Sequence, residues 1–133
     1  MLQKHDLMRQ QEVVAITGLT PRQVQYYTET GIGNPIKTGI GRGSTRLWRR
    51  TDIFDLMIAK ELWSFGCTIG TIERIVPLID QSVGKNFIFI RRHKETFRIL
   101  PYHLMNEDSF ISINLAKIRM KMRKIQTHTI EHK

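Results

Sequence analysis

The stretch from Thr20 to Gly31 constrains the fold most, because it carries both a start signal and a stop signal for one short helix. Thr20 is a good N-cap residue, Pro21 suits the first helical position, and Gln23 stands three residues after the cap, as a capping box requires. Gly31 suits the position at which such a helix ends in a left-handed conformation. The sequence therefore predicts a helix over residues 21–30.

A second short helix is predicted just before this one. The apolar cluster Val13–Ile16 suits a helix with one buried face within residues 8–17, and Gly18 begins the turn that follows. In the next helix, Val24 and Tyr27 lie three residues apart and share one face, which we expect to pack on the first helix. Two short helices joined by a glycine-containing turn are typical of the helix-turn-helix motif, whose second helix enters the major groove of DNA.

A basic segment interrupted by glycines follows. Residues 36–38 and 45–48 are predicted to pair as the two strands of a hairpin, or wing, with glycines at positions 39, 41 and 43 between them. Glycine lets a backbone turn sharply and approach another surface closely. The block from residue 37 to residue 50 contains no acidic residue, and its cations are Lys37, Arg42, Arg46, Arg49 and Arg50. We interpret this block as a loop that contacts nucleic acid; the alternative is a solvated charged surface.

Two more helices are predicted before residue 80. The dipeptide Thr51-Asp52 is expected to cap a longer helix, whose apolar positions repeat at about 3.6 residues and include Trp63 as a core residue. Thr68 is expected to cap a fourth helix, which Pro77 should end or bend. Four helices and a wing thus make up a predicted first domain over residues 1–79.

The remaining residues, 80–133, are predicted to form a second, smaller unit. Residues 87–90 and 96–100 are β-prone and indicate a hairpin, and alternation over residues 111–115 indicates a third strand that enters a helix. Apolar residues of that helix are spaced as in a helix–helix seam. They are Leu115, Ile118, Met122 and Ile125. The seam forms a dimer contact or, alternatively, covers the hairpin sheet.

Composition limits the classes of function. The chain has 133 residues, of which 41% are hydrophobic, enough for one ordinary core. Its formal net charge of +9 favours polyanionic partners. A single cysteine excludes an internal disulfide and a Cys-cluster zinc site. The first residues lack the apolar run of a signal peptide, and no apolar stretch is long enough to cross a membrane. We therefore expect a cytoplasmic, nucleoid-associated protein.

Motifs for catalysis or metal binding do not stand out. The sequence has no Walker-type phosphate loop, no G-x-S-x-G elbow and no HExxH. His128 and His132 are four residues apart, a spacing that can chelate a metal, but two histidines in a terminal segment do not make a site by themselves. Cys67 is expected to be a small buried thiol. We expect no enzyme activity, no cofactor and no bound metal.

The order and spacing of these pieces resemble the DNA-binding domain of the MerR family of bacterial transcription regulators. The matching pieces lie within residues 10–76 and comprise Thr17–Thr20, Arg22, Val24, Tyr26-Tyr27, Gly31-Ile32, Pro35, Arg46–Trp48, Thr51–Ile53, Leu62, Phe65-Gly66, Ile69 and Ile72. The resemblance implies a dimer that reads successive major grooves with the second helix while its wings grip flanking phosphates. Because related regulators dimerise through a C-terminal helix, it favours a dimer contact for the predicted seam.

The resemblance also bears on effectors. Metal-sensing members use cysteines in the C-terminal region, where this chain has none. The pocket-forming domains of drug-sensing members need more residues than the chain has after residue 79. A small-molecule effector is therefore not expected.

The predicted DNA contacts combine the resemblance with the basic wing. They are Thr20, Arg22, Gln23, Gln25, Tyr26, Tyr27, Lys37, Arg42, Ser44, Thr45, Arg46 and Trp48. Gln25 departs from the family, which usually has a second arginine there; a glutamine amide can read adenine but supplies no charge to a phosphate. Trp48 replaces the usual wing tyrosine. Two contacts have an alternative, because Tyr27 shares the buried face of its helix and Trp48 can lock the wing onto the third helix.

The sequence thus predicts a mainly α fold with a small β component. It comprises a winged helix-turn-helix of four helices, then a β-hairpin or small antiparallel sheet and a C-terminal helix. The predicted function is that of a transcription regulator that binds double-stranded DNA as a homodimer, reading the major groove with helix 21–30 and gripping phosphates with wing 36–48. One alternative is an architectural or excisionase-like DNA-binding protein. Another is a protein-interaction module whose basic surface binds an acidic partner.

Overall fold

The computed structural model describes residues 7–38, 45–79, 87–93, 96–100 and 110–122. Several predictions from the sequence fall on residues outside these ranges. They concern Arg42 and Ser44 of the wing, Ile125 of the seam, and the pair His128 and His132.

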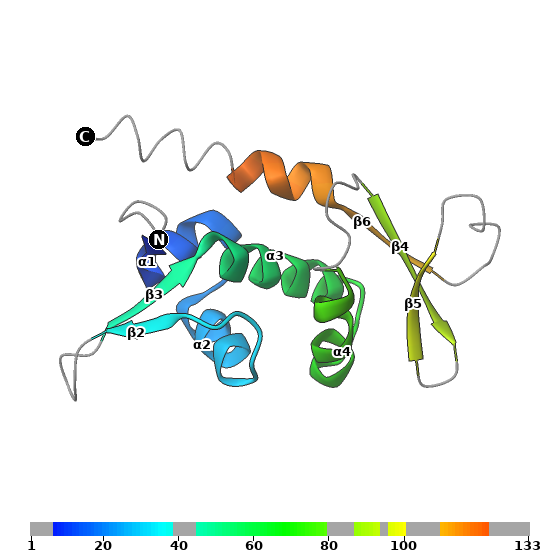
Figure 1. The fold of residues 1–133 in the computed structure, drawn as a ribbon, viewed down its shortest axis with the longest axis horizontal. Helices are drawn as coiled ribbons and strands as arrows, with labels where there is room; N and C mark the ends of the chain where they lie inside the picture. The colour runs from blue at the N-terminus through cyan, green and yellow to red at the C-terminus, as the bar shows by residue number, and fades with distance from the viewer. Residues whose placement is uncertain (1–6, 39–44, 80–86, 94–95, 101–109, 123–133) are drawn as a thin grey trace.

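Helices α1 (Gln10–Thr17) and α2 (Pro21–Glu29) form the helix-turn-helix (Figure 1). At the start of α2, the backbone N–H of Gln23 donates to Thr20 Oγ1 at 3.1 Å, and the backbone N–H of Thr20 donates to Gln23 Oε1 at 2.9 Å. At its end, Gly31 has a φ of 99° and the Ile32 N–H donates to the Tyr27 carbonyl at 2.9 Å. These reciprocal bonds satisfy backbone groups that a helix end otherwise leaves unpaired, so the predicted capping box and glycine stop are confirmed.

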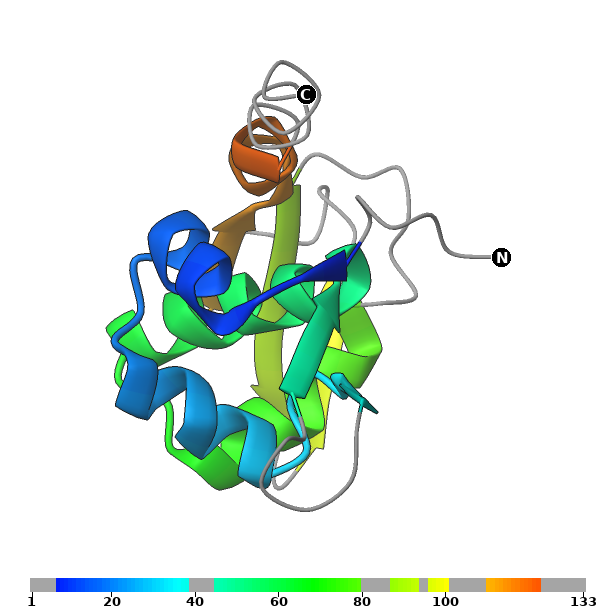
Figure 2. The ribbon, with the colours of Figure 1, turned by 90° about the vertical axis from the view of Figure 1, so that its left-hand side faces the viewer.

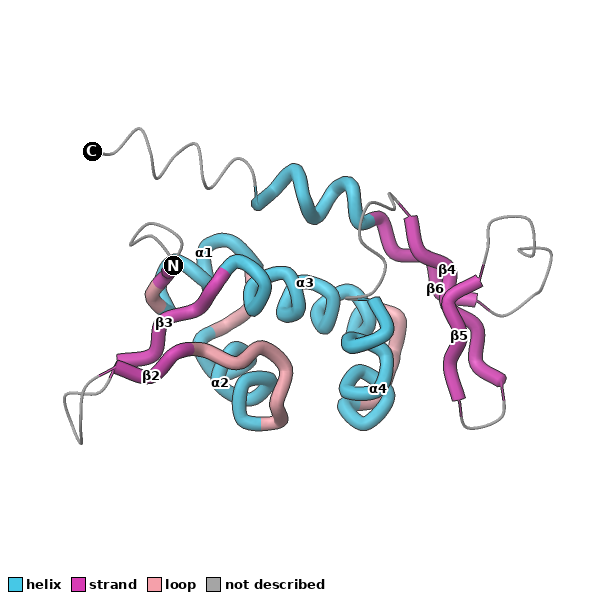
Figure 3. Tube along the Cα trace, in the orientation of Figure 1, coloured by secondary structure: helices cyan, strands magenta, loops and turns pink. Residues whose placement is uncertain are grey.

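The wing consists of β2 (Ile36–Thr38) and β3 (Thr45–Arg49), which pair in antiparallel fashion (Figure 3). The free edge of β3 is covered by an unpredicted strand, β1 (Leu7–Met8), so the order in this sheet is β1-β3-β2. A two-residue strand is too short to show periodicity. The extra strand binds the base of the wing to the chain just before α1.

Helix α3 (Arg50–Ser64) runs through the centre of the helical part, as Figure 1 shows. Most of its apolar side chains are fully buried, including Ile53, Leu56 and Leu62. The prediction that Trp63 belongs to the core is wrong, because this side chain is 52% exposed. Helical periodicity identifies the inward face of α3, but Trp63 lies in the last turn, where the buried part of the helix has already ended at Leu62.

Helix α4 (Ile69–Ile79) begins after Thr68, whose hydroxyl accepts a hydrogen bond from the Thr71 N–H at 3.3 Å. Pro77 was expected to end or bend the helix; α4 does not end there but continues to Ile79, and the bend stays a prediction. The buried side chains of α4 lie on the face toward the core, and Pro77 itself is exposed. The proline thus sits near the end of the helix, on its solvent side.

The C-terminal part contains β4 (Phe87–His93), β5 (Thr96–Leu100) and β6 (Phe110–Asn114). They form an antiparallel sheet of order β5-β4-β6, in which Ile88 stands opposite Ile113. A helix described over residues 115–122 follows β6 directly. In both Figure 1 and Figure 2, this helix lies above α3.

The apolar residues of the C-terminal helix are used within the chain. Leu115, Ile118 and Met122 are 1%, 5% and 8% exposed and belong to the same core cluster as α3 and α4. Their assignment to a dimer contact therefore needs correction, since side chains already enclosed by their own chain are not available for a seam with a second copy. The alternative was that these residues cover the hairpin sheet; the core cluster that contains them includes Ile90 of β4 and Ile113 of β6 as well as side chains of α3 and α4.

One hydrophobic core thus includes side chains from the helix-turn-helix, from α3 and α4, and from the C-terminal part. The predicted fold class is confirmed: a mainly α protein with a wing, a small antiparallel sheet and a C-terminal helix. The division into domains at residue 79 stays a prediction. Over the described ranges, no helix has the length and apolar character needed to cross a membrane.

Candidate nucleic-acid interface

A surface groove of about 470 Å³ joins the start of α1, the exposed side of α2 and the wing. The residues that line it are basic or polar with a single tryptophan: Arg9, Gln10, Gln11, Gln25, Lys37, Thr45, Arg46 and Trp48. Among the residues that the structure describes, no acidic side chain lines this groove. The structure therefore brings the recognition helix and the wing to the same face of the molecule.

Two cations stand side by side on the wing. Lys37 of β2 and Arg46 of β3 are directly opposite each other in the antiparallel pair, and both are exposed. Directly opposed residues point to the same face of a hairpin, and like charges in that arrangement repel. An anion placed against them would relieve the repulsion. This face of the wing is therefore suited to phosphate.

The outer face of α2 presents Arg22, Gln25 and Tyr26, all of them exposed. The Tyr26 ring is 43% exposed, and its centroid lies 5.8 Å from that of Tyr27 in a tilted arrangement. This set offers one cation, one amide and one phenol to solvent. They lie outside the buried face of α2, which carries Val24 and Tyr27.

Tyr27 is placed differently from the prediction of a DNA contact. Its side chain is 2% exposed and lies in the core together with Val24 on the inner face of α2. Burial raises the pKa of the Tyr27 hydroxyl above its ordinary value of 10.0, and the neighbouring Tyr26 adds to the rise. Tyr27 is removed from the contact set because an enclosed ring cannot reach a groove, and the core alternative holds.

Trp48 is also buried, with 1% of its surface exposed, so a direct contact from its ring is wrong as well. Its place in β3 is opposite Met8 of β1, and Trp48 is among the residues that line the groove. Its indole N–H has no hydrogen-bond partner among the described residues. Because Trp48 is buried in the core cluster that also contains the α3 side chains, the alternative that it locks the wing onto the third helix is supported.

The remaining predicted contacts within the described ranges, Thr20, Gln23 and Thr45, are exposed. Thr20 and Gln23 are exposed but already engaged in the capping box described above. Thr45 is exposed on β3 and lines the groove. Whether these side chains contact DNA stays a prediction.

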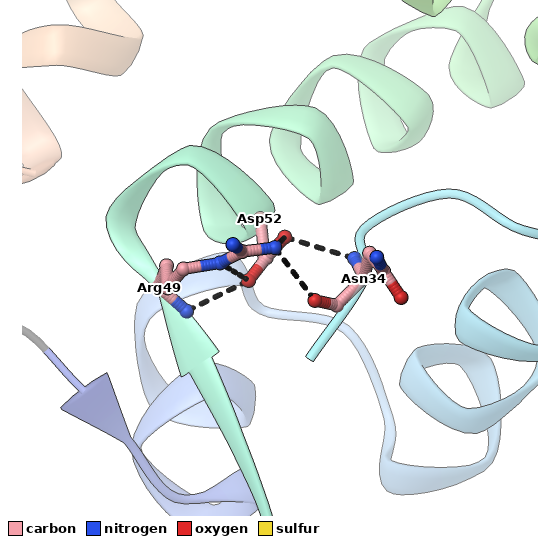
Figure 4. A network of polar contacts seen from close by, with 3 residues as sticks. All are labelled: Asn34, Arg49 and Asp52. Atoms are coloured by element: carbon pink, nitrogen blue, oxygen red, sulfur yellow. Dashed lines mark hydrogen bonds and ion pairs between the residues drawn. The ribbon is translucent and has the colours of Figure 1, made fainter. Parts of the chain in front are cut away.

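A polar network beside the wing was not predicted (Figure 4). Asp52, 3% exposed, accepts hydrogen bonds from the backbone N–H groups of Asn34 and Arg49, each at 2.8 Å. The guanidinium of Arg49 lies 3.2 Å from the Asp52 carboxylate and donates to the Asn34 carbonyl at 2.8 Å. The network joins the turn after α2, the end of β3 and the start of α3, and so fixes the wing relative to the recognition helix.

This network corrects two predictions from the sequence. Asp52 was expected to cap α3 from the start of the helix together with Thr51, but the N-cap is Arg49, and Asp52 reaches back to its N–H from the third helical position. Arg49 was counted with the cations of the basic block, but it is paired with a carboxylate. Its charge contributes less to an anion-binding surface than those of Lys37 and Arg46.

Lys60 connects α3 to the helix-turn-helix. Its Nζ donates to the carbonyl of Thr17 at 2.8 Å, at the C-terminal end of α1, where the helix dipole favours a cation. Thr17 is buried, and its hydroxyl accepts from the Leu19 N–H at 3.1 Å and donates to the Val13 carbonyl at 2.7 Å. The turn between α1 and α2 is thus held from both sides.

Sequence reasoning missed the contribution of α1 to the groove. Arg9, Gln10 and Gln11 line it from the start of this helix. Gln10 also donates to the carbonyl of Pro21 at 3.3 Å, which joins the starts of the two helices. The signal in the sequence is a run of long polar side chains just before an apolar helix, which becomes informative only once β1 has placed that run beside β3.

A smaller hollow of about 250 Å³ lies on another part of the surface, between the turn after α2 and helices α3 and α4. It carries Asp55 and Glu73, so its charge is unsuited to phosphate. Within the described ranges, no group of three or more His, Cys, Asp or Glu side chains could hold a metal ion. Cys67 is half-buried, and burial raises the pKa of its thiol.

Comparison with known families agrees with this architecture. A family model described as MerR HTH family regulatory protein matches residues 8–78. The matched region covers more than half of the 133 residues and includes α1, α2, the wing, α3 and nearly all of α4. No curated protein matches the chain significantly.

Proposed function

This chain belongs to the MerR HTH family of regulatory proteins, and we propose that it reads the major groove of DNA with α2 while its wing holds the flanking phosphates. Family membership makes it a DNA-binding transcription regulator. The finer assignment rests on one observation, the groove that α1, α2 and the wing line together. A recognition helix and a basic hairpin on one face match the way such motifs straddle a duplex.

Each part of the interface has a separate role in this proposal. Arg22, Lys37 and Arg46 are exposed cations and supply phosphate contacts, to which Arg9 at the start of α1 adds a fourth. Gln25 reaches base edges from the exposed side of α2. Phosphate contacts set register and affinity, whereas base contacts set sequence preference.

We also propose that the chain acts as a homodimer. Dimeric helix-turn-helix proteins place two recognition helices about one helical turn of DNA apart, which gives a palindromic site. Since Leu115, Ile118 and Met122 are enclosed within the chain, the contact would use other residues. Sedimentation at micromolar concentration tests this proposal. A single species of monomer mass in the absence of DNA, together with one protein chain per duplex in its presence, would refute it.

Catalysis forms no part of the proposal, because family members of this kind bind DNA and regulate transcription. The architectural alternative differs in its footprint. One palindromic site supports regulation, whereas extended or phased arrays support an architectural role.

The phosphate contacts are tested by salt dependence. Each phosphate contact contributes about 0.9 to the slope of log affinity against log salt concentration. In the proposed dimer each substitution removes one phosphate contact from each of two wings, so Arg46→Ala and Lys37→Ala should each lower the magnitude of that slope by about 1.8 and weaken binding to all sequences alike. Fluorescence anisotropy on a selected duplex at several salt concentrations gives the slope.

The matched control is Lys121→Ala, which removes one charge from the exposed surface of the C-terminal helix. Its slope should equal that of the unaltered chain. A slope that stays the same in the two wing variants would refute the proposed contacts. An equal loss in all three variants would show that net charge, and not the groove, determines binding.

A further inference from the structure

Helix α2 carries a polar contact on its exposed side. The Nε2 of Gln25 donates a hydrogen bond to Oε1 of Glu29 at 3.0 Å. The two residues are four apart, a spacing that makes side chains neighbours on a helix surface. Both are exposed, and an exposed glutamine otherwise samples several rotamers. The contact therefore restricts a side chain that solvent alone would leave mobile.

The carboxylate also determines which way the amide faces. An ionised carboxylate oxygen only accepts hydrogen bonds, so the NH₂ end of the Gln25 amide must turn toward Glu29. One N–H is used in this contact, and the second N–H and Oε1 remain. In the major groove, adenine presents an acceptor at N7 and a donor at N6, and glutamine pairs with both. The atoms left over on Gln25 are the pair that this recognition needs.

Glu29 is otherwise unfavourable on a helix that approaches DNA. It is the one acid of α2 and offsets the one cation, Arg22, so the helix has no net charge. A carboxylate there is repelled by phosphates and lowers affinity for every sequence. A residue that weakens binding in general and orders a base-reading side chain improves discrimination at the expense of strength.

We propose that Glu29 is a positioning residue for sequence specificity, holding the Gln25 amide in the orientation that reads an adenine. This inference rests on the proposed function, because it requires α2 to enter the major groove. Glu29 itself touches no base in this arrangement and acts through Gln25.

The test is a selection of bound sequences from random double-stranded DNA, carried out with the full chain and its variants. Gln25→Ala should abolish a preference for an A·T pair at one position of each half-site, which a bidentate contact makes about 5- to 150-fold. Glu29→Ala should reduce that preference about two- to tenfold. This range lies between the fold-change expected from the free energy of an exposed i,i+4 contact and that expected from the rotamer entropy of a glutamine side chain. Glu29→Ala should also raise affinity for sequences that lack this A·T pair, because a carboxylate that phosphates repel is gone and no adenine contact is lost there. Glu29→Gln keeps an acceptor oxygen for Gln25 and should retain more of the preference.

Two controls separate positioning from other effects. In the Gln25→Ala background, Glu29→Ala should change no base preference, because there is no amide left to orient. Glu61→Ala removes the same charge from the exposed surface of α3 and should leave the preference intact.

The outcomes distinguish this inference from the function on which it rests. An unaltered chain without any sequence preference would refute both. A preference that Glu29→Ala leaves unchanged would overturn the positioning role alone. A change caused by Glu29→Ala in the absence of Gln25 would also overturn it, because Glu29 would then read the base directly.

Discussion

The carboxylate of Asp52 allows the sharpest test of how the wing is held. Asp52→Ala removes the acceptor for two backbone N–H groups, those of Asn34 and Arg49, and for the Arg49 guanidinium (Figure 4). The side chain of Asp52 is 5% exposed, so water does not readily replace it as a partner. The network spans 18 residues of sequence between Asn34 and Asp52, which makes it a long-range tie between the turn after α2 and α3.

The magnitude follows from these three lost partners. Each backbone N–H left without an acceptor costs about 1 kcal/mol of unfolding free energy. The ion pair adds about 1 kcal/mol, a value reduced from that of a fully buried pair because the Arg49 side chain is 35% exposed and screened by solvent. The sum is about 3 kcal/mol, a large fraction of the roughly 5–15 kcal/mol that stabilises a typical domain. The midpoint of thermal unfolding should fall by roughly 10 °C.

Urea unfolding followed by circular dichroism measures this loss, with Glu61→Ala as the exposed-acid control on the same helix. Asp52→Asn keeps one acceptor oxygen but turns an NH₂ group toward backbone donors, so it should recover only part of the stability. DNA affinity should also be lower in Asp52→Ala, even at temperatures well below its unfolding midpoint, because the wing is no longer fixed relative to α2. A stability for Asp52→Ala within 0.5 kcal/mol of the unaltered chain, the range of ordinary surface changes, would refute the argument.

Further predictions concern three single positions. Gly18→Ala should destabilise the chain by about 1–3 kcal/mol, because residue 18 has a φ of 73° and its Cβ would lie 2.6 Å from Lys60 Nζ. Gly70→Ala should instead stabilise the chain by up to about 1 kcal/mol, because residue 70 lies in α4 and an added Cβ would meet no atom within 4 Å. Denaturant unfolding of both variants distinguishes the opposite signs. The thiol of Cys67 should react more slowly with a disulfide reagent in the native chain than in the unfolded chain at pH 8, since burial raises its pKa above the ordinary 9.0. Equal reaction rates in the two states would contradict this. The same pKa shift contributes folding stability that is fully present below pH 9.0 and is lost as pH rises through the folded pKa.

The parts of the fold that the sequence predicted are those with local signals. The ends of α2 depend on Thr20, Gln23 and Gly31, and each acts on backbone groups within a few residues of itself. The strands of the wing and of the C-terminal sheet follow from short β-prone runs. Such signals need no knowledge of the rest of the chain, so one sequence is enough to read them.

The errors arise where a contact joins distant segments. Nothing near Asp52 in the sequence indicates that its carboxylate serves Asn34, 18 residues away. The pairing of Asp52 with Arg49, by contrast, is local, three residues apart, and sequence reasoning overlooked it. The exposure of Trp63 depends on where the neighbouring elements stop covering α3, which its own periodicity does not encode. For the same reason the sequence predicted the basic and polar character of the candidate interface but not all of its residues. The burial of Trp48 and the position of Arg9 in the groove both follow from the pairing of β1 with β3.

The apolar pattern of the C-terminal helix suits either packing within the chain or a seam between two chains, and a substitution at Ile118 distinguishes the two. Its side chain is 5% exposed within the chain's own core. Ile118→Ala should therefore lower the unfolding free energy by about 2–5 kcal/mol, the usual cost of truncating a buried isoleucine. Because the lost contacts are intramolecular, the loss should be the same at 2 and at roughly 200 μM protein, whereas stability supplied by a dimer changes with concentration through mass action. Met120→Ala is the control on the same helix, since Met120 is 56% exposed and should change stability little. If Ile118→Ala instead converted a dimer to a monomer of undiminished stability, the spacing of Leu115, Ile118 and Met122 would be a seam between chains after all, and the enclosed arrangement would be refuted.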